Sequence, residues 1–216
     1  MAEIVPAILT GDPATFQSQL AAFTAFSKRI QLDMSDGSFA PSTTILPGQI
    51  QSLPAGIQVD LHLMVVRPSD YLPHVLRLKP SLVIMHAESG ENLLPIIEQL
   101  KSQGIKVGIA LVPGTFPGRV KAYLDPADHA LIFAGALGKQ GGEADLLQME
   151  KVKLIRALKP DLEIGWDGGA NLTNIRALAH ADLNVINVGS ALSSAPDPAA
   201  TYEQLVTESN QRGVAI

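Results

Sequence analysis

Short apolar runs alternate along this chain with segments whose apolar residues recur at helical spacing. The run Leu82–His86 is continuously apolar and rich in branched side chains, which is typical of a strand buried on both faces. Pro13–Ser27 and Asn92–Gln103 show helical periodicity instead. The first is preceded by the N-cap candidate Asp12, and the second is followed by Gly104. The pattern therefore predicts strands and helices in alternation.

The predicted strands are Ile4–Leu9, Arg29–Met34, Gly56–Val65, Leu82–His86, Ile105–Val112, His129–Phe133, Leu162–Trp166 and Asn184–Val188. The predicted helices are Pro13–Ser27, Pro68–Leu78, Asn92–Gln103, Gly118–Leu124, Asp145–Leu158, Leu172–His180 and Pro198–Gln211. In the helix predicted at Asp145–Leu158, the apolar faces are expected to come from Leu146, Leu147, Met149, Val152, Leu154 and Ile155.

Strands that are nearly all followed by helices indicate a parallel sheet, and eight such units can close into a (β/α)8 barrel. Seven or nine strands would favour an open, doubly wound sheet. No linker divides the chain, so residues 1–216 are expected to form a single (β/α)8 TIM barrel domain. The longest irregular segments, Asp36–Gln49 and Ala134–Ala144, follow strands at the end where a barrel places its active site.

Composition narrows the class of partner. The chain is 46% hydrophobic with a net charge of -5 and no basic run, which argues against nucleic acid as a partner. It has no cysteine, which excludes disulfides and Cys-ligated zinc. The first residues lack the pattern of a signal peptide, and no apolar stretch is long enough to span a bilayer. A cytoplasmic protein that does not bind membranes is expected.

Polar groups end three of the predicted strands and converge if the sheet closes. Asp33 and His62 end neighbouring strands, and Asp167 ends a strand well round the ring. Gln31 shares a face with Asp33, since side chains two apart on a strand point the same way. Carboxylates on opposite faces of one carbon could remove a proton from one face and return it on the other, inverting a centre beside a carbonyl.

Each of these residues also has a structural interpretation. An Asp at a strand end is often a helix cap or a turn former, and Asp36-Gly37 alone would be called a turn. A single inward His is usually a satisfied core group. Asp60, two residues before His62, could serve only to orient that ring. The matching positions on three strands favour the functional interpretation.

Small residues after the last two strands suggest a phosphate site. Gly168 and Gly169 follow strand seven, and Gly189 and Ser190 follow strand eight, where barrels often bind phosphate through backbone N–H groups. The glycine-rich loop that contains Gly138–Gly142 could close over a substrate, with Lys139 reaching phosphate. Ordinary strand–helix turns and a solvated surface lysine are the alternatives.

Motifs along essentially the whole chain resemble the ribulose-phosphate 3-epimerase family. The matching pieces are Pro6–Leu9, Leu32–Pro41, Asp60–Met64, His86–Glu88, Pro113–Thr115, Asp167–Gly169 and Gly189–Ala191. The resemblance implies a (β/α)8 barrel that interconverts ribulose 5-phosphate and xylulose 5-phosphate, with two aspartates as acid and base around a divalent metal, commonly zinc, iron or manganese. It also suggests association as a homo-oligomer.

The resemblance implies roles for particular residues. Asp33 and Asp167 would be the acid/base pair and also metal ligands, with His62 as a third ligand. Substrate or phosphate would contact Met64, His86, Gly141, Gly142, Gly168, Gly169, Gly189 and Ser190.

Departures from the family concentrate at this site. Gln31 stands where the family has a metal-binding His, and a neutral amide oxygen is a weak ligand for zinc. Ala7, Ser35 and Ser42 replace a Ser, a Met and an Asn of the family motifs, and the loop 134–144 departs from the family's pattern. The acid/base pair and the phosphate loops match, so the changes suggest altered metal use or an altered substrate.

Three functions stay open at this point. A sugar-phosphate 3-epimerase is favoured because both aspartates are present. A different isomerase, epimerase or lyase acting on a phosphorylated sugar would suit the changed site. The related decarboxylase and hexulose-phosphate synthase branch is disfavoured, because Ser35 stands where its Asp-x-Lys motif needs a lysine. A non-catalytic binder of a phosphorylated ligand is the third hypothesis.

Overall fold

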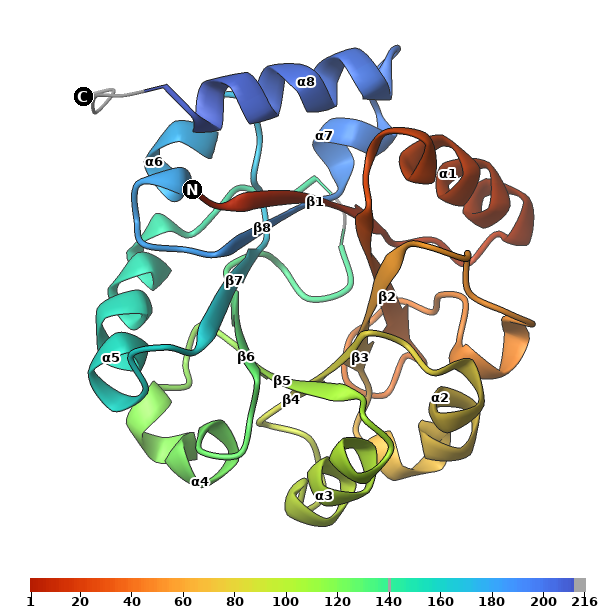
Figure 1. The fold of residues 1–216 in the computed structure, drawn as a ribbon, viewed down its shortest axis with the longest axis vertical. Helices are drawn as coiled ribbons and strands as arrows, with labels where there is room; N and C mark the ends of the chain where they lie inside the picture. Colours follow the sequence, from red (N-terminus) through yellow and green to blue (C-terminus); the bar gives the residue numbers. More distant parts are fainter. Residues whose placement is uncertain (140, 212–216) are drawn as a thin grey trace.

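Eight parallel strands close into a barrel in the computed structural model, which describes residues 1–139 and 141–211 (Figure 1). Each strand pairs with its sequence neighbours, and β8 returns to pair with β1, so no strand edge is left open. The predicted (β/α)8 TIM barrel is confirmed. The strands are β1 (Glu3–Ile8), β2 (Arg29–Ser35), β3 (Gln58–Met64), β4 (Leu82–His86), β5 (Lys106–Leu111), β6 (His129–Phe133), β7 (Glu163–Asp167) and β8 (Val185–Val188).

The helices form a ring outside the barrel, with α8 at its edge beside α6 and α7 (Figure 1). They are α1 (Pro13–Phe26), α2 (Leu72–Leu78), α3 (Leu94–Ser102), α4 (Lys121–Leu124), α5 (Glu150–Leu158), α6 (Ile175–Ala179), α7 (Ser190–Ser193) and α8 (Pro198–Ser209). Four 3-10 turns accompany them, η1 (Pro47–Gln49), η2 (Pro68–Tyr71), η3 (Pro117–Val120) and η4 (Leu146–Met149). The Asp12 cap of α1 is confirmed, since its Oδ2 accepts from Thr15 N at 2.7 Å.

Several helices are shorter than the periodicity predicted. The segments expected at Pro68–Leu78, Gly118–Leu124 and Asp145–Leu158 begin as 3-10 turns, and α6 covers only the middle of Leu172–His180. The short helix α7 was not predicted. The prediction of which residues form the apolar faces of Asp145–Leu158 is wrong in part. Val152 and Ile155 are buried, but Leu147 is 80% exposed, because the 3-10 turn η4 directs its side chain away from the barrel.

Alternation of side chains divides the apolar residues into two layers. Ile30, Leu32 and Met34 of β2 belong to the large cluster that packs between the strands and the surrounding helices. A small separate cluster of Leu82, Ile84, Ala110 and Leu131 fills the barrel interior. The interior is therefore packed at its middle, with polar side chains left at its two ends.

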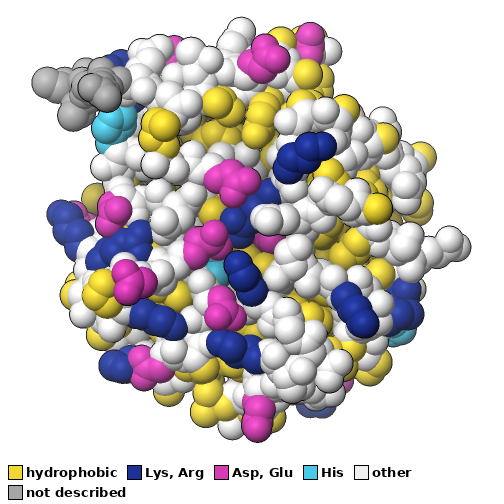
Figure 2. Space-filling model, in the orientation of Figure 1, with side chains coloured by type: hydrophobic (Ala, Val, Ile, Leu, Met, Phe, Trp, Pro, Cys, Tyr) yellow, Lys and Arg dark blue, Asp and Glu magenta, His cyan; other side chains and the backbone are white. Residues whose placement is uncertain are grey.

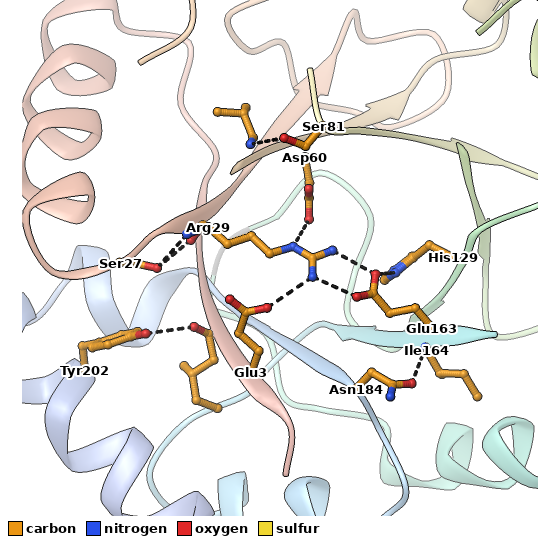
Figure 3. Close-up of polar contacts among 12 residues, drawn as sticks. Glu3, Ser27, Arg29, Asp60, Ser81, His129, Glu163, Ile164, Asn184 and Tyr202 are labelled. Atoms are coloured by element: carbon orange, nitrogen blue, oxygen red, sulfur yellow. Dashed lines mark hydrogen bonds and ion pairs between the residues drawn. The ribbon is translucent and has the colours of Figure 1, made fainter. Parts of the chain in front are cut away.

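A charged network occupies the interior at the amino ends of the strands (Figure 3). The Arg29 guanidinium donates from Nε to Asp60 Oδ2 at 2.8 Å and from Nη1 and Nη2 to the Glu163 carboxylate at 3.0 Å each. Glu3 also accepts from Arg29, at 3.2 Å, and His129 Nδ1 lies 2.7 Å from Glu163 Oε2. Figure 2, which has the orientation of Figure 1, shows charged side chains of both signs gathered over the centre of the barrel.

The position of Asp60 corrects one sequence-based interpretation. The alternative interpretation was that its carboxylate serves to orient His62, but it pairs with Arg29 at the opposite end of the barrel interior. The Arg29 and Asp60 side chains are only 8% and 3% exposed. Asp60 is therefore part of the structural network and not of the site.

Arg29→Met should lower the free energy of unfolding by about 3–5 kcal/mol, because it leaves the Asp60 carboxylate buried without its cation. The double variant Arg29→Met/Asp60→Leu should recover most of that loss, since the carboxylates that still lack Arg29, Glu3 and Glu163, are 48% and 36% exposed. Urea denaturation of both variants measures the two values. A double variant as unstable as the single one would show that the buried pair is not the cause.

Glu163 should make stability pH-dependent. Burial alone would raise the pKa of Glu163, but hydrogen bonds with His129 and Arg29 outweigh it and hold that pKa well below its usual range. A carboxylate with a depressed folded-state pKa contributes stability above its unfolded pKa of about 4.3, and the contribution is lost as pH falls toward the folded value. Urea denaturation at a series of pH values below 5 should give a flatter pH dependence for Glu163→Gln than for wild type. Equal slopes would contradict this assignment.

Candidate functional site

The carboxyl ends of the strands bring the predicted site residues together. Asp33 of β2 and His62 of β3 lie directly opposite each other in the parallel register. Asp167 is the last residue of β7. His62 Nδ1 lies 2.9 Å from Asp33 Oδ1 and 3.4 Å from Asp167 Oδ2. The convergence expected from strand position is therefore present.

Gln31 lies between the two carboxylates. Its Nε2 donates to Asp33 Oδ1 at 2.8 Å and to Asp167 Oδ2 at 2.7 Å, and the whole residue is fully buried. The Asp33 and Asp167 side chains are 9% and 14% exposed. The amide thus links strands β2 and β7 across the barrel interior through both of its N–H groups.

The carboxylates and the imidazole shift each other's protonation. Burial raises the pKa of Asp33, and the charge of Asp167 adds to that rise, outweighing the donors His62 and Gln31. Burial alone would lower the pKa of His62. Its hydrogen bonds with Asp167 and Asp33, together with the negative charges of those carboxylates, outweigh burial and raise this pKa to about 9. The Asp33 carboxyl is therefore biased toward its protonated form, the form that a general acid needs.

His86 supports His62 from behind. The two Nε2 atoms lie 2.9 Å apart, so one ring donates and the other accepts. Burial lowers the pKa of His86 to about 4, which makes the neutral acceptor the form consistent with a protonated His62. His86 packs against Phe39 with ring centroids 4.6 Å apart, and its Nδ1 lies 3.5 Å from Glu88 Oε2. His86 therefore fixes the His62 ring, and a direct role of His86 with substrate stays a prediction.

One cavity joins the acid/base pair to the glycine loops. Besides Asp33, His62 and Asp167, it is lined by most residues predicted to contact substrate or phosphate: Met64, Gly141, Gly142, Gly168, Gly169, Gly189 and Ser190. Lys139 also lines it, whereas Gln140 of the same loop lies outside the described residues. The structure brings these residues together, and their roles in binding stay predictions.

The glycines after β7 are needed for close backbone approach. Gly168 has φ +125°, and a Cβ there would lie 2.2 Å from Gly135 N, in the loop that follows β6. The Gly168 carbonyl accepts from Trp166 Nε1 at 2.9 Å, and the Gly169 carbonyl accepts from the side chains of Asn171 and Asn174. With both carbonyl oxygens already bonded, fewer free acceptors remain to repel an anion in this cavity.

Asn187 is a cavity residue that the sequence analysis missed. It pairs in register with Asp167, is 2% exposed and lines the cavity, and its Oδ1 has no partner among the described residues. In the sequence it is only the fourth residue of the predicted strand Asn184–Val188, among apolar neighbours. The signal that could have found it is the parity of β8, which places a polar amide inside the barrel. Phe133 and Ala7 also line the cavity.

Three of the four groups at the centre have the chemistry of a metal site. Asp33, His62 and Asp167 each offer one ligand atom, and these atoms lie within 4.8 Å of one another. Gln31 does not fit such a site in this structure. Its amide presents two hydrogens to the same carboxylate oxygens that a cation would need, where a ligand would present a lone pair.

Comparison with known sequences assigns the family. The sequence profile described as "Ribulose-phosphate 3 epimerase family" matches residues 3–193. The chain belongs to the ribulose-phosphate 3-epimerase family. It is 31% identical over 211 residues to the cytoplasmic isoform of ribulose-phosphate 3-epimerase from Oryza sativa subsp. japonica, covering 94% of this chain and 92% of that protein. It is 30% identical to the Schizosaccharomyces pombe ribulose-phosphate 3-epimerase, covering 91% and 89% of the two chains.

The predicted family is thereby confirmed, and with it the class of isomerases acting on carbohydrate phosphates.

The residues that depart from the family motifs have different surroundings in the structure. Ala7 lines the cavity, whereas Ser35 Oγ donates to Ser42 O at 2.7 Å and so serves the loop after β2. Within the described ranges, no helix has the length and apolarity to cross a bilayer.

Solved structures of low sequence identity share the fold. A 3-hexulose-6-phosphate synthase from Salmonella typhimurium superposes with a TM-score of 0.70 at 13% identity, covering 95% of this chain and 97% of that one. An orotidine 5'-phosphate decarboxylase from Pyrococcus horikoshii gives a TM-score of 0.66 at 13% identity, covering 97% and 100% of the two chains. These similarities support the barrel architecture alone.

Gly168→Ala should cost about 1–3 kcal/mol of stability, because the added methyl group overlaps the backbone of the loop that follows β6. The matched control is Gly118→Ala, where a Cβ would meet nothing within 4 Å. That control should change stability by less than about 0.5 kcal/mol. Urea denaturation compares the two, and equal effects would contradict the close approach of the two loops.

Proposed function

We propose that this chain is a sugar-phosphate 3-epimerase that interconverts D-ribulose 5-phosphate and D-xylulose 5-phosphate. The observation that carries the proposal is the pair Asp33 and Asp167, buried on one cavity with their facing oxygens within 4.8 Å of each other. The family and its relatives' names support the substrate class. Sugar phosphate as partner, homo-oligomerisation and a cytoplasmic location belong to the same proposal.

The reaction needs one carboxylate as base and the other as acid. The ionised member takes the proton from C3, and the electrons of the C3–H bond form a C2=C3 double bond while the C2 carbonyl electrons move to oxygen. The protonated member then gives its proton to the opposite face of C3, and the carbonyl re-forms. The roles reverse in the return direction, so no redox partner or co-substrate is needed.

Binding of the phosphate group is assigned to the glycine loops at the same cavity. Gly168, Gly169, Gly189 and Ser190 line its wall after β7 and β8. Their lack of bulky side chains lets backbone N–H groups approach an anion, and Lys139 adds a cation from the loop after β6. The phosphate would then fix the sugar so that C3 lies between the two carboxylates.

His62 completes the environment of the pair. It contacts both carboxylates and is completely buried, so its ring is held by Asp33, Asp167 and His86 together. A hydrogen-bond donor at the position of His62 holds the two carboxylates so that their remaining lone pairs face the cavity. His62→Asn should therefore impair turnover through misplaced carboxylates.

Asp33→Asn and Asp167→Asn should each lower kcat by about 10²–10⁴-fold, because each removes a group that exchanges the C3 proton. Proton NMR of D-ribulose 5-phosphate with each variant measures the appearance of xylulose 5-phosphate, and circular dichroism checks the fold. Asp70→Asn, at an exposed surface pair with Arg67, is the control and should keep wild-type turnover. Full turnover in either site variant would exclude the two-aspartate mechanism.

A substrate panel separates this function from the neighbouring ones. Wild-type turnover of another ketose phosphate, without turnover of ribulose 5-phosphate, would favour a different sugar-phosphate isomerase or lyase. Calorimetric binding of ribulose 5-phosphate without exchange at C3 would favour a non-catalytic binder.

A further inference from the structure

The two carboxylates of the site already share one donor group. Gln31 Nε2 lies 2.8 Å from Asp33 Oδ1 and 2.7 Å from Asp167 Oδ2, so both amide hydrogens are directed at the pair. Asp33 and Asp167, with His62, also make up the candidate group of metal ligands, and His62 Nδ1 lies 2.9 Å and 3.4 Å from the same two oxygens. A cation and the amide NH2 group would therefore compete for the same lone pairs.

Charge fixes which way the amide faces. Turning it over would place Oε1 at 2.7–2.8 Å from two carboxylate oxygens, and even with one carboxyl protonated at least one of these oxygen–oxygen contacts would lack a hydrogen. In the orientation present, Oε1 is buried and has no partner among the described residues, which is itself unfavourable. The contact with both carboxylates outweighs that cost, because hydrogen bonds to charged acceptors are the stronger kind.

We infer that the Gln31 amide replaces a divalent metal at this site, so that the enzyme holds its acid/base pair together without a bound ion. Gln31 would act as a positioning residue that keeps Asp33 and Asp167 at a short separation despite their mutual repulsion. The catalytic part of this inference rests on the proposed epimerase function, and the metal-binding part does not.

Two single substitutions should convert the site back into a metal site. Gln31→Glu keeps the shape of the side chain but replaces the donor NH2 group by an acceptor oxygen, giving three carboxylates and an imidazole, a set suited to Mn²⁺. Gln31→His supplies a second imidazole, which suits Zn²⁺. In both variants the competing hydrogens are gone, so a change in metal affinity tests the donor role of Gln31 separately from its packing.

The experiment compares chelator-treated wild type, Gln31→Glu and Gln31→His by calorimetric titration with Mn²⁺ and with Zn²⁺. We expect Gln31→Glu to bind Mn²⁺ and Gln31→His to bind Zn²⁺ at least about tenfold more tightly than wild type does. The melting temperature of each variant should rise on adding its metal, whereas that of wild type should not. Wild-type turnover of ribulose 5-phosphate should be the same before and after chelation.

The inference is overturned if wild type carries about one equivalent of a divalent metal as purified, or if it binds Zn²⁺ as tightly as Gln31→His does. Loss of wild-type turnover on chelation, restored by added metal, overturns it as well. Should one variant fail to fold, the other still gives the affinity comparison.

The two proposals fail in different ways. If wild type turns over no sugar phosphate but binds metal at least about tenfold more weakly than the variants, the function is wrong and the metal replacement stands. If wild type is an active epimerase that needs added metal, the function stands and the metal replacement is wrong.

Discussion

Alternation of side chains in a closed parallel barrel is the constraint on which this structure depends. Because β8 pairs with β1, the barrel is closed and every second residue of each strand points into its interior. The kind of side chain that fills the interior changes along the barrel axis. A charged network around Arg29 lies at the amino ends, the small apolar cluster of Leu82, Ile84, Ala110 and Leu131 lies at the middle, and the acid/base pair lies at the carboxyl ends. The apolar middle separates two buried groups of charges that would otherwise interact.

The site follows from the cost of burying two like charges. Asp33 and Asp167 come from β2 and β7 and are both almost inaccessible, so they require donors on the protein side. Gln31 and His62 supply those donors, and His86 fixes His62 in turn. Since these partners reach the carboxylates from within the barrel, the side open to substrate is the cavity lined by the glycine loops. A proton-transfer site and its orientation thus arise from the same set of hydrogen bonds.

The alternation of strands and helices, the barrel and the convergence of Asp33, His62 and Asp167 could be predicted from the sequence, because they depend on apolar runs and on residue parity, which are local. The Arg29–Asp60 pair could not, because it requires two side chains on neighbouring strands to reach toward each other below the apolar layer. Asn187 was missed because a single amide in a short apolar strand does not stand out, although the alternation of side chains along that strand could have placed it inside the barrel. Some helices were predicted too long because the 3-10 turns η2, η3 and η4 run directly into the helices that follow them. Gln31 was recognised as an anomaly, but the direction of its hydrogens depends on the separation of two carboxylates, and that separation is a property of the closed barrel.

The central claim is that the buried aspartate pair moves the proton at C3. Its most direct test is proton NMR of D-ribulose 5-phosphate in deuterated water with wild-type protein, once after chelation and once with added Zn²⁺ or Mn²⁺. The account predicts that the C3 proton signal is lost, that xylulose 5-phosphate appears, and that one solvent deuterium is found at C3 of the product. Xylulose 5-phosphate that retains the original hydrogen at C3, or a C3 signal that never changes in the presence of active-site-intact protein, would contradict it.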